Sequence, residues 1–261
     1  MAILDSKTKT GISWVKESVD LFKIAPRKWL LLALAYIGLF VMLPSVPGLQ
    51  FFAFISILIW PVFLAIAIAL YRNAEMKKQQ NIGEIVTQIQ PKIQTLIGLG
   101  GACLLYAVLV SFVLNSDLQG LQTLVDINEK KPVGPPIGML LQIMLPLLLK
   151  LTLLLIPLMM ATWFSPMLIA FNNYGLVKAI KSSIAGSIQY MVALSAAWAV
   201  LTAGILLLML AVGIVAGVVS AMVPALGQML MSFIVFGCLL LATALMLAFQ
   251  YVSYRDVFRA A

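Results

Sequence analysis

The chain has no histidine and only two cysteines among its 261 residues. Without histidine it lacks the commonest general base and the commonest metal ligand of proteins. Cys103 and Cys238 each lie within an apolar run, so we expect them to be small packing residues and not a disulfide. Also missing are a G-x-S-x-G elbow, a phosphate-binding P-loop and a dinucleotide-binding glycine pattern. The sequence therefore predicts a protein that is not an enzyme and uses no cofactor.

Charge is the second thing that this chain has little of. Only 10% of its residues are charged and 63% are hydrophobic, with a mean hydropathy of +1.08. Soluble chains average about 45–50% apolar and about 25% charged residues. A helix needs about 20 apolar residues to cross a hydrocarbon core of roughly 30 Å. We therefore predict an all-α membrane protein with six transmembrane helices and no separate soluble domain.

The positive charges are unevenly distributed along the chain. Lys and Arg number 17 against 9 Asp and Glu, for a formal net charge of +8. Most of them lie in the N-terminal arm, in two alternate connections and in the C-terminal tail, whereas Lys130 and Lys131 are the basic residues of the connection 115–136. This asymmetry follows the positive-inside rule and predicts that both termini are cytoplasmic. Because the basic residues stand at span ends and form no groove-sized patch, we expect no binding to nucleic acid.

Three short basic segments organise the chain. Residues 13–28, 81–92 and 175–189 each place apolar side chains on one helical face and polar ones on the other. Each segment runs directly into a pair of long apolar segments. We interpret each as an amphipathic helix, or elbow, that lies on the cytoplasmic membrane surface before the chain turns into a helical hairpin. The sequence thus predicts three elbow-plus-hairpin units.

The boundaries of these units follow from the same pattern. Residues 1–28 are predicted to be a cytoplasmic arm with an amphipathic interfacial helix, and residues 29–71 the first hairpin. Residues 72–171 hold the second elbow and hairpin, with an outer loop at 115–136. Residues 172–261 hold the third elbow, its hairpin and a cytoplasmic tail.

The apolar run 137–171 is too long for one perpendicular span. Either it is tilted, or its first part lies at the outer interface and the crossing begins near Pro146, which we favour. Lys150 within this run is either an intramembrane functional group or, more simply, a lysine whose stem reaches the outer surface. The candidates for lining a small cavity in the bundle are Lys150, Asn172, Ser165 and Gln142.

The basic elbows are the best candidates for function. Each Lys or Arg near an anionic leaflet contributes about 1 kcal/mol of attraction. These residues either only orient and anchor the spans, or they bind phospholipid headgroups or a partner. The candidate contact residues are Lys23, Arg27, Lys28, Lys92, Lys178 and Lys181.

Tryptophan and small residues add local expectations. Trp14 and Trp29 suit the headgroup level, where an indole keeps its ring in apolar surroundings and its N–H wet. Gly98 and Ala102 have the small-xxx-small spacing of a close helix contact. The same spacing recurs over residues 213–221, at Gly213, Gly217 and Ala221.

Two patterns suggest a family. Trp14-x-x-x-Ser18-x-x-Leu21-Phe22-x-x-x-Pro26 before a span resembles the start of a family of uncharacterised bacterial inner-membrane proteins. Trp163-Phe-Ser-Pro166-Met-Leu, followed by Ala179-x-x-x-Ser183, resembles the later half of that family. More distantly, the repeated elbow is similar to the membrane domain attached to some glycerophosphodiester phosphodiesterases. The chain lacks their catalytic domain, so the resemblance implies a multi-pass protein of the bacterial inner (cytoplasmic) membrane and no phosphodiesterase activity.

We therefore expect a polytopic inner-membrane protein that works as a non-enzymatic module. It would contact membrane lipids, anionic ones among them, or a membrane-protein partner, in an accessory or assembly role. The alternative is a small transporter or channel for lipid-like or small solutes. A transporter needs a polar seam through the spans, and Lys150 with scattered Ser, Thr and Gln is all that the apolar runs supply. The sequence leaves the oligomeric state open.

Overall fold

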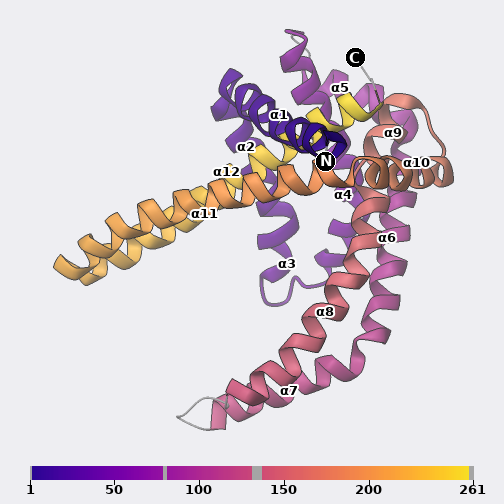
Figure 1. Cartoon of the computed structure of the whole chain (residues 1–261). Helices are drawn as coiled ribbons and strands as arrows, with labels where there is room; N and C mark the ends of the chain where they lie inside the picture. The colour runs from indigo at the N-terminus through magenta and orange to yellow at the C-terminus, as the bar shows by residue number, and fades with distance from the viewer. Residues whose placement is uncertain (1, 79–80, 131–136, 259–261) are drawn as a thin grey trace.

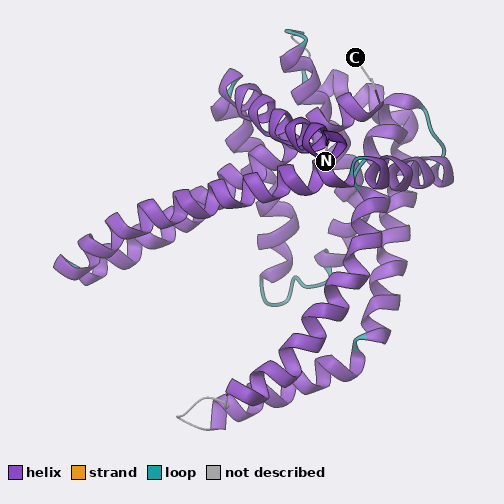
Figure 2. Cartoon of the chain, viewed as in Figure 1, coloured by secondary structure: helices purple, strands orange, loops and turns teal. Residues whose placement is uncertain are grey.

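The computed structural model describes residues 2–78, 81–130 and 137–258. These residues are almost entirely helical, and no strand occurs among them (Figure 2). The elements, in chain order, are α1 (Ala2–Ile24), α2 (Pro26–Ile37), η1 (Gly38–Met42), α3 (Leu43–Ser45), α4 (Phe52–Glu75), α5 (Ile82–Ile89), η2 (Gln90–Lys92), α6 (Ile93–Val113), α7 (Asn115–Lys130), α8 (Ile137–Thr162), α9 (Ser165–Asn172), α10 (Leu176–Gln189), α11 (Met191–Met222) and α12 (Pro224–Phe258).

Within the described residues, six helical stretches are long and apolar enough to cross a membrane. They confirm the predicted all-α class and the number of spans, and they indicate a multi-pass membrane protein. Their side chains are exposed to a degree that water would not tolerate: Phe112 is 76% exposed and Leu153 is 71% exposed. The six stretches are Pro26–Ser45, Phe52–Glu75, Ile82–Val113, Leu141–Asn172, Met191–Met222 and Met229–Phe258.

The hairpins spread from one end of the molecule. We call this end the hub; it consists of α1, α5, α9 and α10 with the adjoining ends of the long helices (Figure 1). From the hub, α11 with α12 and α6 with α8 extend as two arms in different directions, and α2 to α4 form a third, shorter projection between them (Figure 1). The largest buried side chains, such as Trp14, Tyr71, Phe164 and Tyr251, belong to one core cluster in the hub.

Proline residues mark the points where short helices join the long ones. Pro26 begins α2 directly after α1 ends at Ile24, because proline is tolerated in the first turn of a helix but not in its interior. Gln90–Lys92, with Pro91, makes the same kind of junction between α5 and α6. Helix α1 thus directly precedes the candidate span Pro26–Ser45 and α10 the span Met191–Met222, whereas α5 forms the first part of the stretch Ile82–Val113.

The connection after α6 is more regular than a loop. Residues Asn115–Lys130 form α7, which packs against α8, while residues 131–136 of the predicted outer loop lie outside the described residues. Helix α8 continues through Pro146 and Pro157, and the chain breaks only at Trp163 and Phe164. The second arm is thus a single long helix facing two shorter ones.

Small residues make the close helix contacts, but at other positions than predicted. A Cβ built on Gly100 would lie 2.5 Å from the carbonyl oxygen of Leu58, so α4 and α6 touch there through their backbones. At Gly98 the nearest side chain is 3.7 Å away, and nothing lies within 4 Å at Gly213 or Gly217. The predicted contact near Gly98 is therefore displaced to Gly100, and no close helix approach occurs at Gly213 or Gly217 within the described residues.

Candidate functional site

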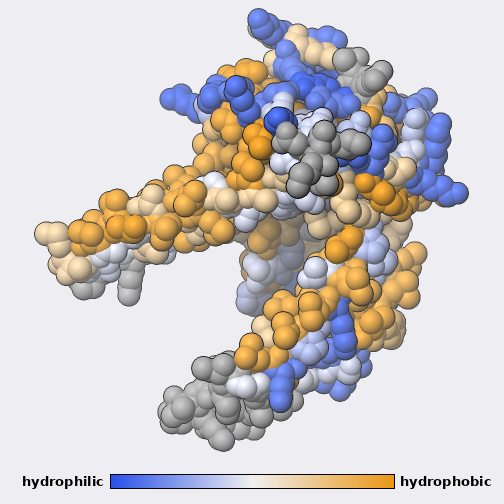
Figure 3. Space-filling model, viewed as in Figure 1, coloured by the Kyte–Doolittle hydropathy of each residue, from blue (hydrophilic) through white to orange (hydrophobic). Residues whose placement is uncertain are grey.

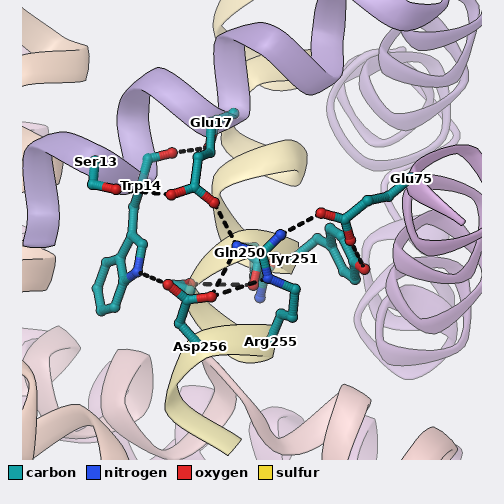
Figure 4. A network of polar contacts seen from close by, with 10 residues as sticks. Ser13, Trp14, Glu17, Glu75, Gln250, Tyr251, Arg255 and Asp256 are labelled. Carbon is teal, nitrogen blue, oxygen red and sulfur yellow. Dashed lines mark hydrogen bonds and ion pairs between the residues drawn. The ribbon is translucent and has the colours of Figure 1, made fainter. Parts of the chain in front are cut away.

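The hub contains a polar network centred on Arg255 of α12 (Figure 4). The Arg255 Nη2 atom lies 2.5 Å from Glu17 Oε2 on α1 and 2.9 Å from Asp256 Oδ1. Its Nη1 atom pairs with Glu75 Oε1 at the end of α4, and the Tyr251 hydroxyl donates to the second oxygen of Glu75. One guanidinium thus links α1, α4 and α12.

The electrostatics of this network fit a structural tie. A guanidinium carries five donors in a planar fork, so it can serve three carboxylates at once. The Arg255 side chain is 22% exposed and those of its partners are 34–39% exposed. Water therefore screens the network only in part, and its charge-assisted bonds are stronger than those of a fully exposed pair. Among the described residues no group of three or more His, Cys, Asp or Glu side chains is placed to hold a metal ion.

The two tryptophans predicted at headgroup level are buried in the protein core, so the expectation that each indole N–H meets water is wrong. Trp14 is fully buried and its indole N–H donates to Asp256 Oδ2 at 2.8 Å, which extends the Arg255 network. Trp29 is 3% exposed, donates to the carbonyl oxygen of Leu21 and stacks on Tyr71 with ring centroids 3.9 Å apart. An indole can be buried in protein when its N–H finds an acceptor there, as both do here.

A second polar cluster provides hydrogen-bond partners for the backbone groups at the break between α8 and α9. The Ser183 hydroxyl on α10 accepts from the Phe164 N–H at 3.0 Å and donates to the carbonyl oxygen of Met160 at 2.7 Å. The Gln250 amide on α12 donates to the carbonyl oxygen of Trp163 at 2.7 Å. Buried backbone groups need such partners where a helix is interrupted. Side chains of α10 and α12 therefore fix the bend between α8 and α9.

The two sequence patterns that suggested a family meet in this hub. Their members come from α1 and from the region of α9 and α10, far apart in the chain. Those with at most 5% exposure include Trp14, Ser18, Leu21, Phe164, Ser165, Met167, Leu168, Ala179 and Ser183. The patterns therefore describe how the hub packs.

The predicted contact residues all lie on the hub end of the molecule, at the α1–α2 junction, in η2 and on α10 (Figures 1 and 3). Five of them are exposed and Lys92 is half-buried. Lys23 pairs with Asp20 at 2.9 Å, and this hydrogen bond lowers the pKa of the Asp20 carboxyl. The exposed members are Lys23, Arg27, Lys28, Lys178 and Lys181. Their binding of lipid or of a partner stays a prediction.

The four predicted cavity residues do not come together. Gln142 and Lys150 are exposed on α8, and the Lys150 ammonium pairs with Asp117 of α7 at 2.9 Å. Ser165 is buried on α9. At a helical rise of about 1.5 Å per residue, it lies about 20 Å along the chain from Lys150. Asn172 ends α9 and accepts from the Tyr254 hydroxyl.

Two apolar cavities lie elsewhere, between the long helices. One of about 490 Å³ opens between η1, α4, α6 and α8. Another of about 300 Å³ lies between α11 and α12, beside Trp198 and Met246. The lining of the larger cavity includes Phe40, Ser56, Trp60, Cys103, Ala107 and Thr162.

No protein family, curated protein or solved structure matches the chain in comparisons of its sequence and fold. The resemblance drawn from Trp14, Ser18 and the later pattern thus stays a prediction. Function has to be argued from the geometry of the hub and the arms.

Proposed function

We propose that this protein is a non-enzymatic module of the bacterial inner membrane that contacts lipids or a membrane partner through the open sides of its hairpins. The supporting observation is the spread of the two long arms from one hub (Figure 1). In the most apolar window of Met191–Met222, and likewise of Leu141–Asn172, only 6% of residues are buried, against 39% in Phe52–Glu75. Such surfaces are stable only against lipid or another apolar surface.

A transporter or channel is the second candidate, and the larger cavity argues against it. Its wall offers two hydroxyl groups, and both are already donated to backbone carbonyls. Ser56 donates to Leu39 at 3.0 Å and Thr162 donates to Leu158 at 2.8 Å. A solute with several polar groups would find few further hydrogen-bond partners in this apolar wall. The cavity therefore suits hydrocarbon better than a polar solute.

We further propose that the hub faces the cytoplasm, with α1, α5 and α10 at the membrane surface and both termini inside. Hydrophilic residues gather over the hub and hydrophobic ones over the arms (Figure 3). Helix α6 has 21 residues and a length of about 31 Å, close to the thickness of the hydrocarbon core. Asp117 and Lys150 pair just beyond the end of α6, which supports an outer surface at that level and a snorkelling Lys150.

Thiol labelling tests both the orientation and the transporter alternative. Cys103 lines the larger cavity, so in a Cys238→Ala variant it reports on water there. We expect a charged, membrane-impermeant maleimide to leave Cys103 unmodified in intact and in permeabilised cells, because the cavity holds hydrocarbon. Modification of Cys103 from either side would instead support a water-filled pathway.

Two further variants, made with both native cysteines replaced by alanine, calibrate this experiment. Ser116→Cys on α7 should be labelled in intact cells, and Lys181→Cys on α10 only after permeabilisation, since both positions are exposed. Labelling of Lys181→Cys in intact cells would reverse the proposed orientation.

Photo-crosslinking tests contact through the arms. Leu207 on α11 is 65% exposed, whereas Leu168 in the hub is fully buried. With a diazirine amino acid of leucine size at position 207, irradiation of membranes should give adducts with a phospholipid or a second protein. The same group at position 168 should link only within the chain. Equal external adducts at both positions would contradict the packed hub with open arms.

A further inference from the structure

The last turn of α4 carries a cation without a counter-charge. The Arg72 guanidinium carbon lies 5.4 Å from the centre of the Phe171 ring on α9, and the side chain is half-buried. Among the carboxylates whose side chains the structure describes, none pairs with Arg72 within 4.0 Å. Glu75, one turn later on the same helix, is taken by Arg255 and Tyr251.

A second such cation stands at the start of α10. The Lys178 ammonium lies 4.0 Å from the centre of the Tyr174 ring, and again no carboxylate among the described residues pairs with it. Phe171 packs against Tyr254 with ring centroids 6.0 Å apart. Arg72 and Lys178 therefore flank one short turn, residues 171–174.

The carboxylates of the Arg255 network and of α1 are already engaged. Glu17, Glu75 and Asp256 surround Arg255, and Asp20 pairs with Lys23. Cations held over aromatic faces keep a fixed direction, and a partly desolvated guanidinium is stabilised most by an oxyanion that accepts from its fork. An anion from outside the chain can supply that oxyanion.

We propose that Arg72 and Lys178 together bind the phosphate of an anionic phospholipid headgroup at the junction of α4, α9 and α10. This rests on the proposed function, which puts the hub at the membrane surface. Arg72 is in the last turn of the span Phe52–Glu75, and α9 ends the span Leu141–Asn172, so both lie at the level of lipid phosphates. The Phe171 and Tyr174 rings present apolar surface beside the two cations. Two cations facing one phosphate leave a surplus positive charge, which favours an anionic lipid over a zwitterionic one.

Native mass spectrometry of the full chain tests the site. After delipidation in detergent, the protein is titrated with phosphatidylglycerol, with phosphatidylcholine and with inorganic phosphate as a competitor. We expect Arg72→Gln and Lys178→Gln each to weaken phosphatidylglycerol binding about 5-fold, the factor for about 1 kcal/mol per basic residue, and the double variant about 25-fold. Lys16→Gln removes an exposed charge from α1 and should change binding less than 2-fold.

The other outcomes of the titration bear separately on the site, on its ligand and on the proposed function. Equal binding by wild type and both Gln variants would overturn the site while the module could still hold lipid elsewhere. Displacement by inorganic phosphate at millimolar concentration would assign the site to free phosphate. No lipid bound by the wild type would overturn the site and count against the proposed function. Lys178→Gln alters an exposed side chain and keeps the test valid if Arg72→Gln impairs folding.

Discussion

Arg255→Ala is expected to destabilise the protein by about 2–3 kcal/mol. The substitution leaves Glu17, Glu75 and Asp256 near one another without the cation that holds them. Breaking a fully buried pair costs about 3–5 kcal/mol, and the partial exposure of these groups reduces that figure. For a chain of this size, thermal unfolding followed by circular dichroism should shift down by about 5–10 °C.

The control for this prediction is Arg27→Ala. Arg27 is exposed at the start of α2, so its loss removes the same charge without unpairing a network and should shift the transition by less than 2 °C, the scale of a surface substitution. Adding Glu75→Gln to Arg255→Ala should restore part of the lost stability, because one unpaired carboxylate is then neutral. Equal unfolding temperatures for the two arginine variants would contradict the role assigned to Arg255.

Gly100→Ala and Gly101→Ala should change stability in opposite directions. A Cβ at Gly100 would lie 2.5 Å from the Leu58 carbonyl oxygen and 2.7 Å from that of Ile57, so α4 and α6 must move apart. Overpacking of this kind costs about 1–3 kcal/mol. At Gly101 nothing lies within 4 Å, and alanine there stabilises a helix by about 0.5–1 kcal/mol.

The two adjacent glycines act as controls for each other, because both lie inside α6 and gain the same methyl group. The measurement is the unfolding temperature of each purified variant in the same detergent. Unchanged stability in Gly100→Ala would contradict the backbone contact of α4 with α6, and a loss of stability in Gly101→Ala would contradict the open space at that position.

The spans were predictable because each is a long apolar run, and length with composition decides whether a helix can cross a bilayer. The hub was not predictable in the same way. Arg255 meets Glu17 across 238 positions and Glu75 across 180, so no local spacing connects them. Helical periodicity tells which residues share a face, but it does not tell which face meets which neighbour.

Because periodicity does not tell which helices meet, it also missed the contacts behind the other differences between prediction and structure. Trp14 on α1 fits the sequence pattern of an interfacial residue, yet in the fold its N–H donates to the carboxylate of Asp256. Gly98 had the expected spacing, yet the crossing of α4 and α6 falls at Gly100. Lys150 stood out as a lone charge in the sequence, and its partner Asp117 is 33 positions away on another helix. In each case a tertiary contact determined the outcome.

The length of α11 has a mechanical consequence. Helix α11 has 32 residues and a length of about 48 Å, whereas α6, with 21 residues, matches a hydrocarbon core of about 30 Å. A helix longer than the core is accommodated by tilting, so in a bilayer we expect α11 and α12 to lean more than α6. Both arms are fixed to one hub, so a thicker bilayer would draw them together and a thinner one would spread them. Hydrophobic mismatch would thus couple the acyl-chain length of the surrounding lipid to the shape of this protein.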